Sequence, residues 1–142
     1  MLFYFLYLYP MIRKLIFATA VLFATACNSG KDERPSTALD TGREFIRASL
    51  DGNFEKAGSL IHPDEENKQL FETYKEFYAQ LPAKDKESYK TASYEINELK
   101  ELNDSATVIN YSNSYMKKPM EIMVSKKNAV WGIDFKYSYS NK

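Results

Sequence analysis

Apolar residues recur at helical spacing between residues 41 and 81, and at every second position after residue 91. A period near 3.6 residues indicates amphipathic helices, whereas a period of two indicates strands with one buried face. Clusters of turn-forming residues separate these segments. The pattern predicts helices over 41–51, 53–61 and 63–81, followed by strands over 91–102, 105–115, 120–125 and 129–139.

The ends of the first two predicted helices carry capping residues. Asp40 or Thr41 is placed to cap the first helix, and Gly52 is placed to close it. Asn53 is placed to cap the second helix. This helix is expected to stop before Pro63, because a residue that precedes proline avoids the α-helical region.

The third predicted helix has the longest apolar stripe. Pro63 is expected to start it, with the acidic residues 64–66 in its first turn, where they suit the helix dipole. Pro82 ends the stripe, and the charged residues 84–90 are expected to form a loop or a single helical turn. The stripe consists of Leu70, Phe71, Tyr74, Phe77, Tyr78 and Leu81.

The last predicted strand alternates most clearly. Asp134 and Lys136 fall on one face, where we expect a solvated pair. Helices followed by four strands predict an α+β fold, in which about three helices cover one face of an antiparallel meander. The opposite face of the last strand carries Trp131, Ile133, Phe135, Tyr137 and Tyr139.

A further apolar segment, residues 15–23, precedes this domain. Arg13 and Lys14 come before it, and the small residues 24–26 lead to Cys27, the one cysteine of the chain. This order is typical of a secretory signal. It resembles the signal of bacterial lipoproteins, in which the cysteine receives a diacylglyceryl group and then an N-acyl chain such as palmitate.

The resemblance implies a signal peptide over residues 1–26, a lipidated Cys27 and a single domain over residues 41–142. Residues 1–10 either extend the signal or precede the true start at Met11, and the positive region after Met11 favours the second interpretation. The alternative to a lipoprotein signal is a transmembrane anchor, since about 20 apolar residues span a bilayer.

Residues 27–40 are expected to form the lipid attachment point and a flexible tether. They are polar after Cys27, contain Gly30 and Pro35, and lack apolar periodicity. Residues 31–33, Lys-Asp-Glu, resemble the surface-export signal of Bacteroidota lipoproteins, although an ordinary solvated linker has the same composition. We expect attachment to the outer membrane of the cell envelope, with exposure on the cell surface as a further implication.

Two phrases in the domain resemble those of nuclear-transport-factor-2-like (NTF2-like, or cystatin-like) domains. FIRASLDGNFEKAGSLI, residues 45–61, joins two short helices through an Asp-Gly-Asn turn, and WGIDF, residues 131–135, lies in the last predicted strand. The resemblance covers roughly residues 39–139 and implies a cone, in which helices pack into the concave side of a curved sheet. Small lipoproteins of unknown function have this layout, and the fold alone does not define an activity.

Composition narrows the possible functions. The chain has 19 Lys and Arg and 19 Asp and Glu residues, and removal of Arg13 and Lys14 with the leader leaves a net charge of −2. A domain with this charge has no electrostatic reason to bind nucleic acid. One cysteine excludes an internal disulfide, and no metal-ligand spacing or cofactor motif is present, so we expect neither a metal nor a cofactor.

The chain offers few catalytic candidates. His62 is the only histidine and could act as a general base, but no nucleophile motif accompanies it. At a helix break before proline it is expected to be a surface or packing residue. The enzymes among NTF2-like domains carry an acid inside the cone, whereas the alternation directs Asp134 away from the aromatic face.

Aromatic residues are better candidates for a binding site than for catalysis. They could line a pocket for a hydrophobic ligand or a sugar, or form an ordinary core with hydroxyls at its rim. The candidate pocket residues are Tyr74, Tyr78, Tyr94, Tyr111, Trp131, Phe135 and Tyr137. Separately, Asp104-Ser105-Ala106 resembles the O-glycosylation motif of Bacteroidota secreted proteins, which would modify Ser105, and is also typical of a hairpin turn.

These observations favour a non-enzymatic, lipid-anchored envelope domain that binds a small ligand or an envelope protein through its cone. A small hydrolase or isomerase that uses His62 or an acid in the cone is the first alternative. A structural subunit of an outer-membrane complex is the second.

Overall fold

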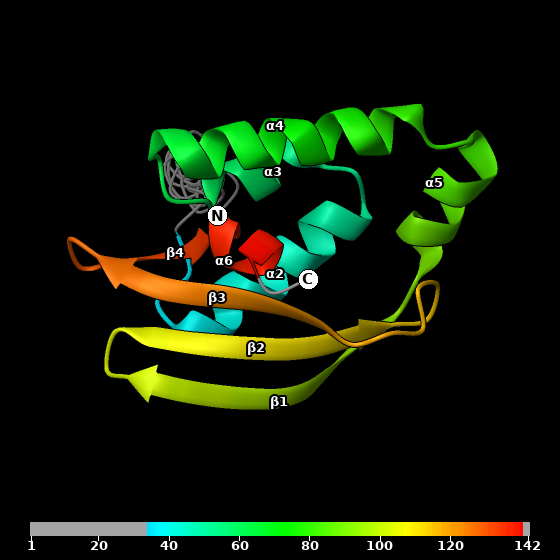
Figure 1. The fold of residues 1–142 in the computed structure, drawn as a ribbon. Coiled ribbons are helices and arrows are strands. Elements are labelled where there is room, and N and C mark those ends of the chain that lie inside the picture. Colours follow the sequence, from blue (N-terminus) through cyan, green and yellow to red (C-terminus); the bar gives the residue numbers. More distant parts are fainter. Residues whose placement is uncertain (1–33, 141–142) are drawn as a thin grey trace, which may run out of the picture. The chain divides into compact units, whose positions relative to one another are not determined.

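The computed structural model describes residues 34–140. In this part of the chain, four helices precede a four-stranded sheet, and one short helix follows it (Figure 1). The expected signal peptide, Cys27 and the tether as far as residue 33 lie outside the described residues. The helices before the sheet are α2 (Ala38–Leu50), α3 (Phe54–Ser59), α4 (Glu65–Gln80) and α5 (Ala83–Thr91). The strands are β1 (Tyr94–Asn103), β2 (Ala106–Asn113), β3 (Met120–Lys127) and β4 (Val130–Asp134), and the last helix is α6 (Phe135–Ser140).

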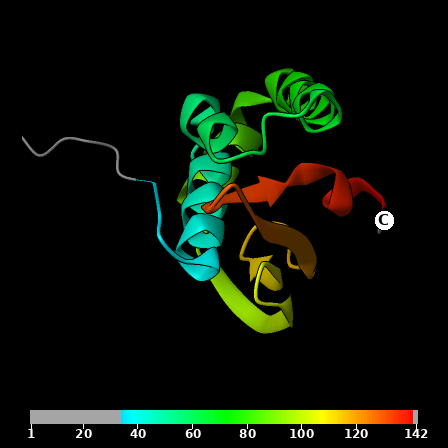
Figure 2. The ribbon, with the colours of Figure 1, turned by 90° about the vertical axis from the view of Figure 1, so that its left-hand side faces the viewer.

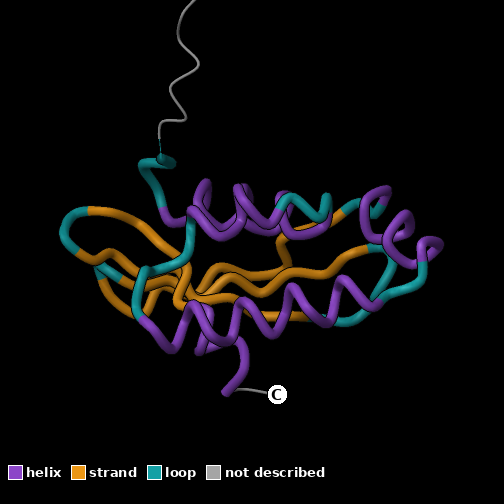
Figure 3. The backbone as a smooth tube through the Cα atoms, turned by 90° about the horizontal axis from the view of Figure 1, so that it is seen from above, coloured by secondary structure: helices purple, strands orange, loops and turns teal. Residues whose placement is uncertain are grey.

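The sheet is an antiparallel meander in the order β1-β2-β3-β4. Helix α2 packs on β2, β3 and β4, so it supplies the cover that the buried face of the sheet requires. Helix α4 contacts α3 and α6, and Figures 2 and 3 show it apart from α2, on the side of the domain where α6 lies. The predicted α+β fold, with helices followed by a four-stranded antiparallel meander, is confirmed.

Helix α2 begins three residues earlier than the sequence pattern predicted. Thr37 is the cap: its side chain accepts a hydrogen bond from the Asp40 amide at 3.1 Å and donates one to the Asp40 carboxylate at 2.7 Å. Thr37 thus satisfies an amide of the first turn, so neither Asp40 nor Thr41 fills this role. Gly52 ends the helix with a φ of 71°, a conformation that glycine adopts without steric cost.

The start of α4 is also shifted. Asn53 caps α3 as expected, with its side chain accepting a hydrogen bond from the Lys56 amide. At α4 the cap is Asp64, which accepts from the Asn67 amide at 3.1 Å, so the helix begins at Glu65 rather than at Pro63. The charged stretch after Pro82 is longer than one turn: it forms α5, and Arg47 donates to the carbonyls of Lys90 and Ala92 at its end.

Strand β1 contains a bulge that the regular alternation did not anticipate. Its register with β2 shifts between Ile96 and Glu98, so Leu99 pairs with Ile109. An extra residue in one strand reverses the faces of all residues that follow it. Strand β1 is also an edge strand whose exposed residues include several charged ones, a composition that discourages pairing with another chain.

The prediction of one long final strand over 129–139 is wrong, because the chain leaves the sheet after Asp134 and forms α6. Phe135 packs between helices, with its ring centroid 5.4 Å from that of Phe71 and 6.0 Å from that of Phe45. The first turn of α6 has a distant partner, since the Lys136 amide donates to the Asn67 side chain at 2.8 Å. The face of the last strand that carries Trp131 and Ile133 therefore ends at Ile133 and does not continue to Phe135 and Tyr137. The side chain of Tyr139 lies outside the described part of the chain.

Candidate functional site

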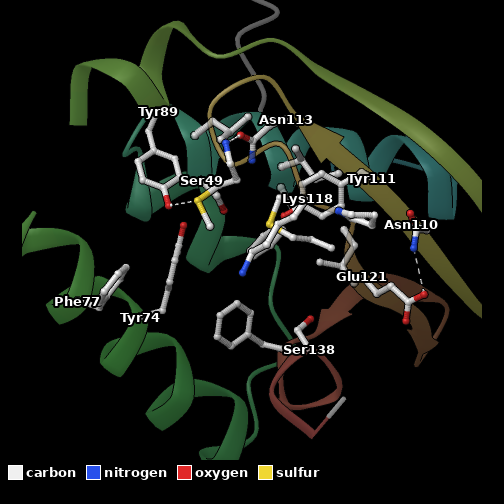
Figure 4. A pocket seen from close by; sticks show the side chains of 18 of the residues that line it. Ser49, Tyr74, Phe77, Tyr89, Asn110, Tyr111, Asn113, Lys118, Glu121 and Ser138 are labelled. Carbon is white, nitrogen blue, oxygen red and sulfur yellow. Dashed lines mark hydrogen bonds between the residues drawn. The ribbon is translucent and has the colours of Figure 1, made fainter. Parts of the chain in front are cut away.

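A cavity of about 760 Å³ lies between the helices and the inner face of the sheet (Figure 4). This volume lies within the range of small-molecule sites, about 300–1,000 Å³. Helices α2, α4, α5 and α6 contribute to its walls, together with β2, β3 and the connection between these two strands. The buried lining is mostly apolar: Phe45, Ile46, Leu50, Ile122 and Phe135 are each at most 6% exposed.

Two hydroxyl groups in this lining have no hydrogen-bond partner among the described residues. They are Ser49 Oγ on α2 and Ser138 Oγ on α6, and both atoms are buried. Ser49 is 8% exposed as a whole residue. A buried hydroxyl without a partner costs about 1–3 kcal/mol, so a polar ligand atom that reached either hydroxyl would recover part of that cost.

Two tyrosines supply neutral polar groups on the opposite sides of the cavity. Burial raises the pKa of Tyr111 on β2 to about 12. Burial, and then the charge of Asp85, also raises the pKa of Tyr89 on α5. The Tyr89 hydroxyl donates to Met116 Sδ at 3.1 Å, as the dashed line in Figure 4 shows. Both phenols therefore stay neutral near pH 7 and add no negative charge to the cavity.

The lining at the mouth of the cavity is exposed and more polar. Phe77 on α4 is 57% exposed. Lys118, in the connection between β2 and β3, and Glu121 on β3 are also exposed. The Glu121 carboxylate accepts a hydrogen bond from Asn110 at 3.2 Å, and Figure 4 shows this pair at one side of the cavity. The site thus combines an apolar interior with a charged rim.

The seven aromatic residues proposed from the sequence fall into two groups. Tyr74, Tyr111 and Phe135 line the cavity, with the Tyr74 ring 5.8 Å from that of Phe135. The other four do not contribute to its lining. Tyr78 packs on Phe54, Tyr94 donates to the Arg43 carbonyl, Trp131 lies under Lys126, and Tyr137 is half-buried on α6.

Several lining residues were not among the sequence candidates. Met116, Lys118 and Pro119 come from a turn, where periodicity gives no signal. Ser49 and Ser138 are small polar residues on helices, and only their lack of partners distinguishes them. Phe77 belonged to the predicted apolar stripe, but its exposure at the mouth could not be read from spacing.

His62 is buried rather than on the surface, with 5% of its area exposed. Its Nε2 atom lies 2.8 Å from Ser125 Oγ and 3.1 Å from the Ser125 carbonyl oxygen. A hydrogen bond to the carbonyl oxygen requires the proton on Nε2, and in that tautomer Nε2 takes no proton from the serine. Burial, and then the charge of Lys127, holds the pKa of His62 below its ordinary value. The geometry therefore fits a packing role, and neither residue lines the cavity.

The expectation of a solvated Asp134 is wrong, since this residue is 6% exposed. It lies on the face opposite Ile133, as the alternation indicated, but that face is covered beside β4. The segment before α4 pairs with β4, through hydrogen bonds from Ile133 N to the Leu60 carbonyl and from His62 N to the Ile133 carbonyl. The His62 ring lies so close to Gly132 that a Cβ atom there would be 2.8 Å from Nδ1.

Ser105 lies exposed in the turn between β1 and β2, where its amide donates to the Asn103 side chain at 2.8 Å. The position is accessible to a modifying enzyme and is equally that of an ordinary hairpin turn. Within residues 34–140, no three His, Cys, Asp or Glu side chains form a group that could hold a metal ion. No helix in the same part of the chain has the length and apolar character needed to cross a bilayer.

No family model matches the chain, and the search of curated proteins found no significant match. Among solved structures, the fold is similar to that of an NTF-2-like protein of unknown function from Shewanella oneidensis MR-1. The two share 18% sequence identity with a TM-score of 0.48, over 67% of this chain and 89% of that one.

Proposed function

We propose that the domain binds a small, largely apolar molecule in the cavity between α2, α4 and the sheet. The observation that carries this proposal is a cavity of about 760 Å³ with a buried apolar lining, which includes two serines whose buried hydroxyls lack partners among the described residues. Protein interiors are otherwise close-packed, so a binding role explains an apolar cavity of this size better than a role in stability does.

The hydroxyls of Ser49 and Ser138 indicate that the ligand also carries polar atoms. They lie on different helices, α2 and α6, and so can bind separate groups of one molecule. Aromatic rings of Phe45, Tyr74 and Phe135 provide flat apolar surfaces for its body. Such a combination of an apolar lining and few polar groups is characteristic of small-molecule sites.

An enzymatic role has less support. The cavity lining contains one carboxylate among the described residues, that of Glu121, which is exposed and hydrogen-bonded to Asn110. A general acid or base with a shifted pKa usually requires burial. His62 and Ser125 meet outside the cavity, and the proton on Nε2 opposes activation of the serine.

We further propose that this NTF2-like binding domain is held at the outer membrane through lipid on Cys27. The order of the basic, apolar and small residues before Cys27 supports the anchor. Residues 28–36, which precede the Thr37 cap of α2, supply a polar tether. The Lys-Asp-Glu sequence over 31–33 supports exposure on the cell surface. Its partners would then be the membrane and a ligand, or an envelope protein that delivers the ligand.

The binding proposal can be tested with the uncharged fluorescent probe N-phenylnaphthylamine. We expect its fluorescence to rise with the wild-type protein and its affinity to fall about tenfold in Met120→Trp, because Met120 lines the cavity. Met123→Trp is the matched control, since Met123 is also half-buried on β3 but does not line the cavity. Phe77→Ala should weaken binding without disturbing the fold, because Phe77 is 57% exposed.

Cooperative urea unfolding of each variant establishes that it is folded. Absence of probe binding by the wild-type protein would overturn the proposal. Equal losses in Met120→Trp and Met123→Trp would do the same, because they would place the probe elsewhere.

A further inference from the structure

We propose that the ligand is an apolar monocarboxylate, whose carboxylate stays at the mouth beside Lys118 while its body fills the cavity. This inference rests on the proposed binding function and specifies the chemical class of the ligand. It is carried by the single basic side chain that the described residues contribute to the lining, and by the arrangement of the other polar groups in the lining.

Among the described residues, Lys118 is the only basic one in the cavity lining, and it is exposed. No salt bridge joins it to an acidic residue in the described part of the chain. Figure 4 shows its side chain over the cavity, on the side of Tyr111. An ammonium group at this position can bind an anion and remain hydrated, so it avoids the desolvation cost of a fully buried pair.

The negative groups near the cavity do not compete for this position. Glu121 is held by Asn110 at 3.2 Å, and Figure 4 shows that pair turned away from the cavity centre. The tyrosine hydroxyls are neutral because burial raises the pKa of Tyr111 to about 12 and also raises the pKa of Tyr89. A negative head group therefore meets the ammonium group of Lys118, while the carboxylate of Glu121 is held beside Asn110.

The interior requires the rest of the ligand to be uncharged. Phe45, Ile46, Leu50, Ile122 and Phe135 are buried and offer no charged partner, and a charge placed among them would lose its hydration. A molecule with its carboxylate at one end and an apolar body matches this division. The buried hydroxyls of Ser49 and Ser138 can bind a neutral oxygen atom on that body.

Three ten-carbon compounds that differ only in the head group test the inference. Decanoate, decanol and decylamine are titrated against bound N-phenylnaphthylamine below their micelle concentrations. We expect decanoate to displace the probe at about tenfold lower concentration than the other two, a difference of about 1.4 kcal/mol. Because exposed charges are screened by salt, this preference should shrink as the ionic strength rises.

Lys118→Met is expected to remove the preference while leaving decanol binding unchanged. Lys117→Met is the matched control: Lys117 is the preceding residue, is also exposed and does not line the cavity. Both variants lose one positive charge, so an effect of net charge alone would appear in both. The control should keep the preference of the wild-type protein.

Three results would overturn the inference while the binding function stands. The first two are equal displacement by the three compounds in the wild-type protein and an undiminished carboxylate preference in Lys118→Met. The third is a preference for decylamine, which would point to Glu121. Failure of N-phenylnaphthylamine to bind at all would instead overturn the proposed function.

Discussion

The hydroxyl group of Ser49 is buried without a hydrogen-bond partner among the described residues, and this predicts an unusual effect of its removal on stability. The residue is 8% exposed and its Oγ atom lacks a partner within residues 34–140. Removing an unpaired buried hydroxyl relieves a desolvation cost. We expect Ser49→Ala to leave the free energy of unfolding in urea unchanged or to raise it by up to about 1 kcal/mol.

Thr41→Val on the same helix is the control for Ser49→Ala. Thr41 is fully buried, and its hydroxyl donates to the Thr37 carbonyl at 2.8 Å. Loss of that hydrogen bond should lower the free energy of unfolding by about 1 kcal/mol. A similar loss in Ser49→Ala would mean that the Ser49 hydroxyl has a stabilising partner in solution.

His62 should make the stability of the domain depend on pH. Burial lowers its pKa from 6.5 in the folded state, and Lys127 lowers it further. The hydrogen bond to the Ser125 backbone and the charges of Asp134 and Asp64 only partly oppose this. The unfolded chain then takes up the proton at a higher pH than the folded one. Stability is therefore full above about pH 6.5 and falls as the pH decreases toward the lowered pKa.

Urea unfolding at about pH 7.5 and pH 5.5 measures this effect. The wild-type protein should lose more stability between these values than His62→Gln, which does not titrate but retains a donor for the Ser125 carbonyl. Asp64 does not interfere, because its hydrogen bonds from Asn67 outweigh its burial and hold its pKa below 3.8. Identical pH profiles for the two proteins would contradict the assignment.

Asn67 connects two elements that are far apart in the sequence. It is fully buried, its amide group donates to the Asp64 carboxylate at 2.8 Å, and its oxygen accepts from the Lys136 amide at 2.8 Å. Asn67→Ala leaves the first turn of α6 without this acceptor. We expect a loss of about 1–3 kcal/mol in the free energy of unfolding and faster hydrogen exchange of the Lys136 amide.

Asn97→Ala is a suitable comparison for Asn67→Ala. Asn97 also makes two side-chain hydrogen bonds at 2.8 Å, but it is exposed in the bulge of β1. Its loss should cost less than about 0.5 kcal/mol. Unchanged exchange at Lys136 in Asn67→Ala would show that α6 does not depend on this contact.

The elements were predictable where local pattern determines them. Helical spacing located α2, α3 and α4, and the turn residues located the hairpins of the meander. The pattern could not reveal α6, because Phe135, Tyr137 and Tyr139 continue the alternation of β4. Strand β4 ends because Phe135 and the Lys136 amide contact Phe71 and Asn67 on α4, which lie more than 60 residues earlier in the sequence.

The cavity is a property of the whole domain, and the sequence predicted only part of it. Alternation assigns a residue to a face of the sheet but not to a position along the strand. Tyr111 and Trp131 were both proposed for the pocket, yet only Tyr111 lies in the part that α2, α4 and α5 surround. Burial of His62 and Asp134 likewise depends on the segment that pairs beside β4.

The predicted anchor concerns the whole chain and can be tested directly. In a bacterial host, Cys27→Ser should abolish incorporation of labelled palmitate and move the protein from the membrane fraction to the soluble fraction. The physical reason is that each buried methylene contributes about 0.8 kcal/mol, so several acyl chains hold a protein firmly. Ser29→Ala is the control, and labelling that persists in Cys27→Ser would contradict the lipoprotein interpretation.

The contact between Gly132 and His62 has a consequence for how this domain can evolve. A Cβ atom at position 132 would lie 2.8 Å from His62 Nδ1, and the ring is fixed by its contacts with Ser125. Position 132 therefore accepts a side chain only after position 62 has become smaller. Among diverging descendants the two positions should co-vary, with a residue larger than glycine at 132 accompanied by a small residue at 62.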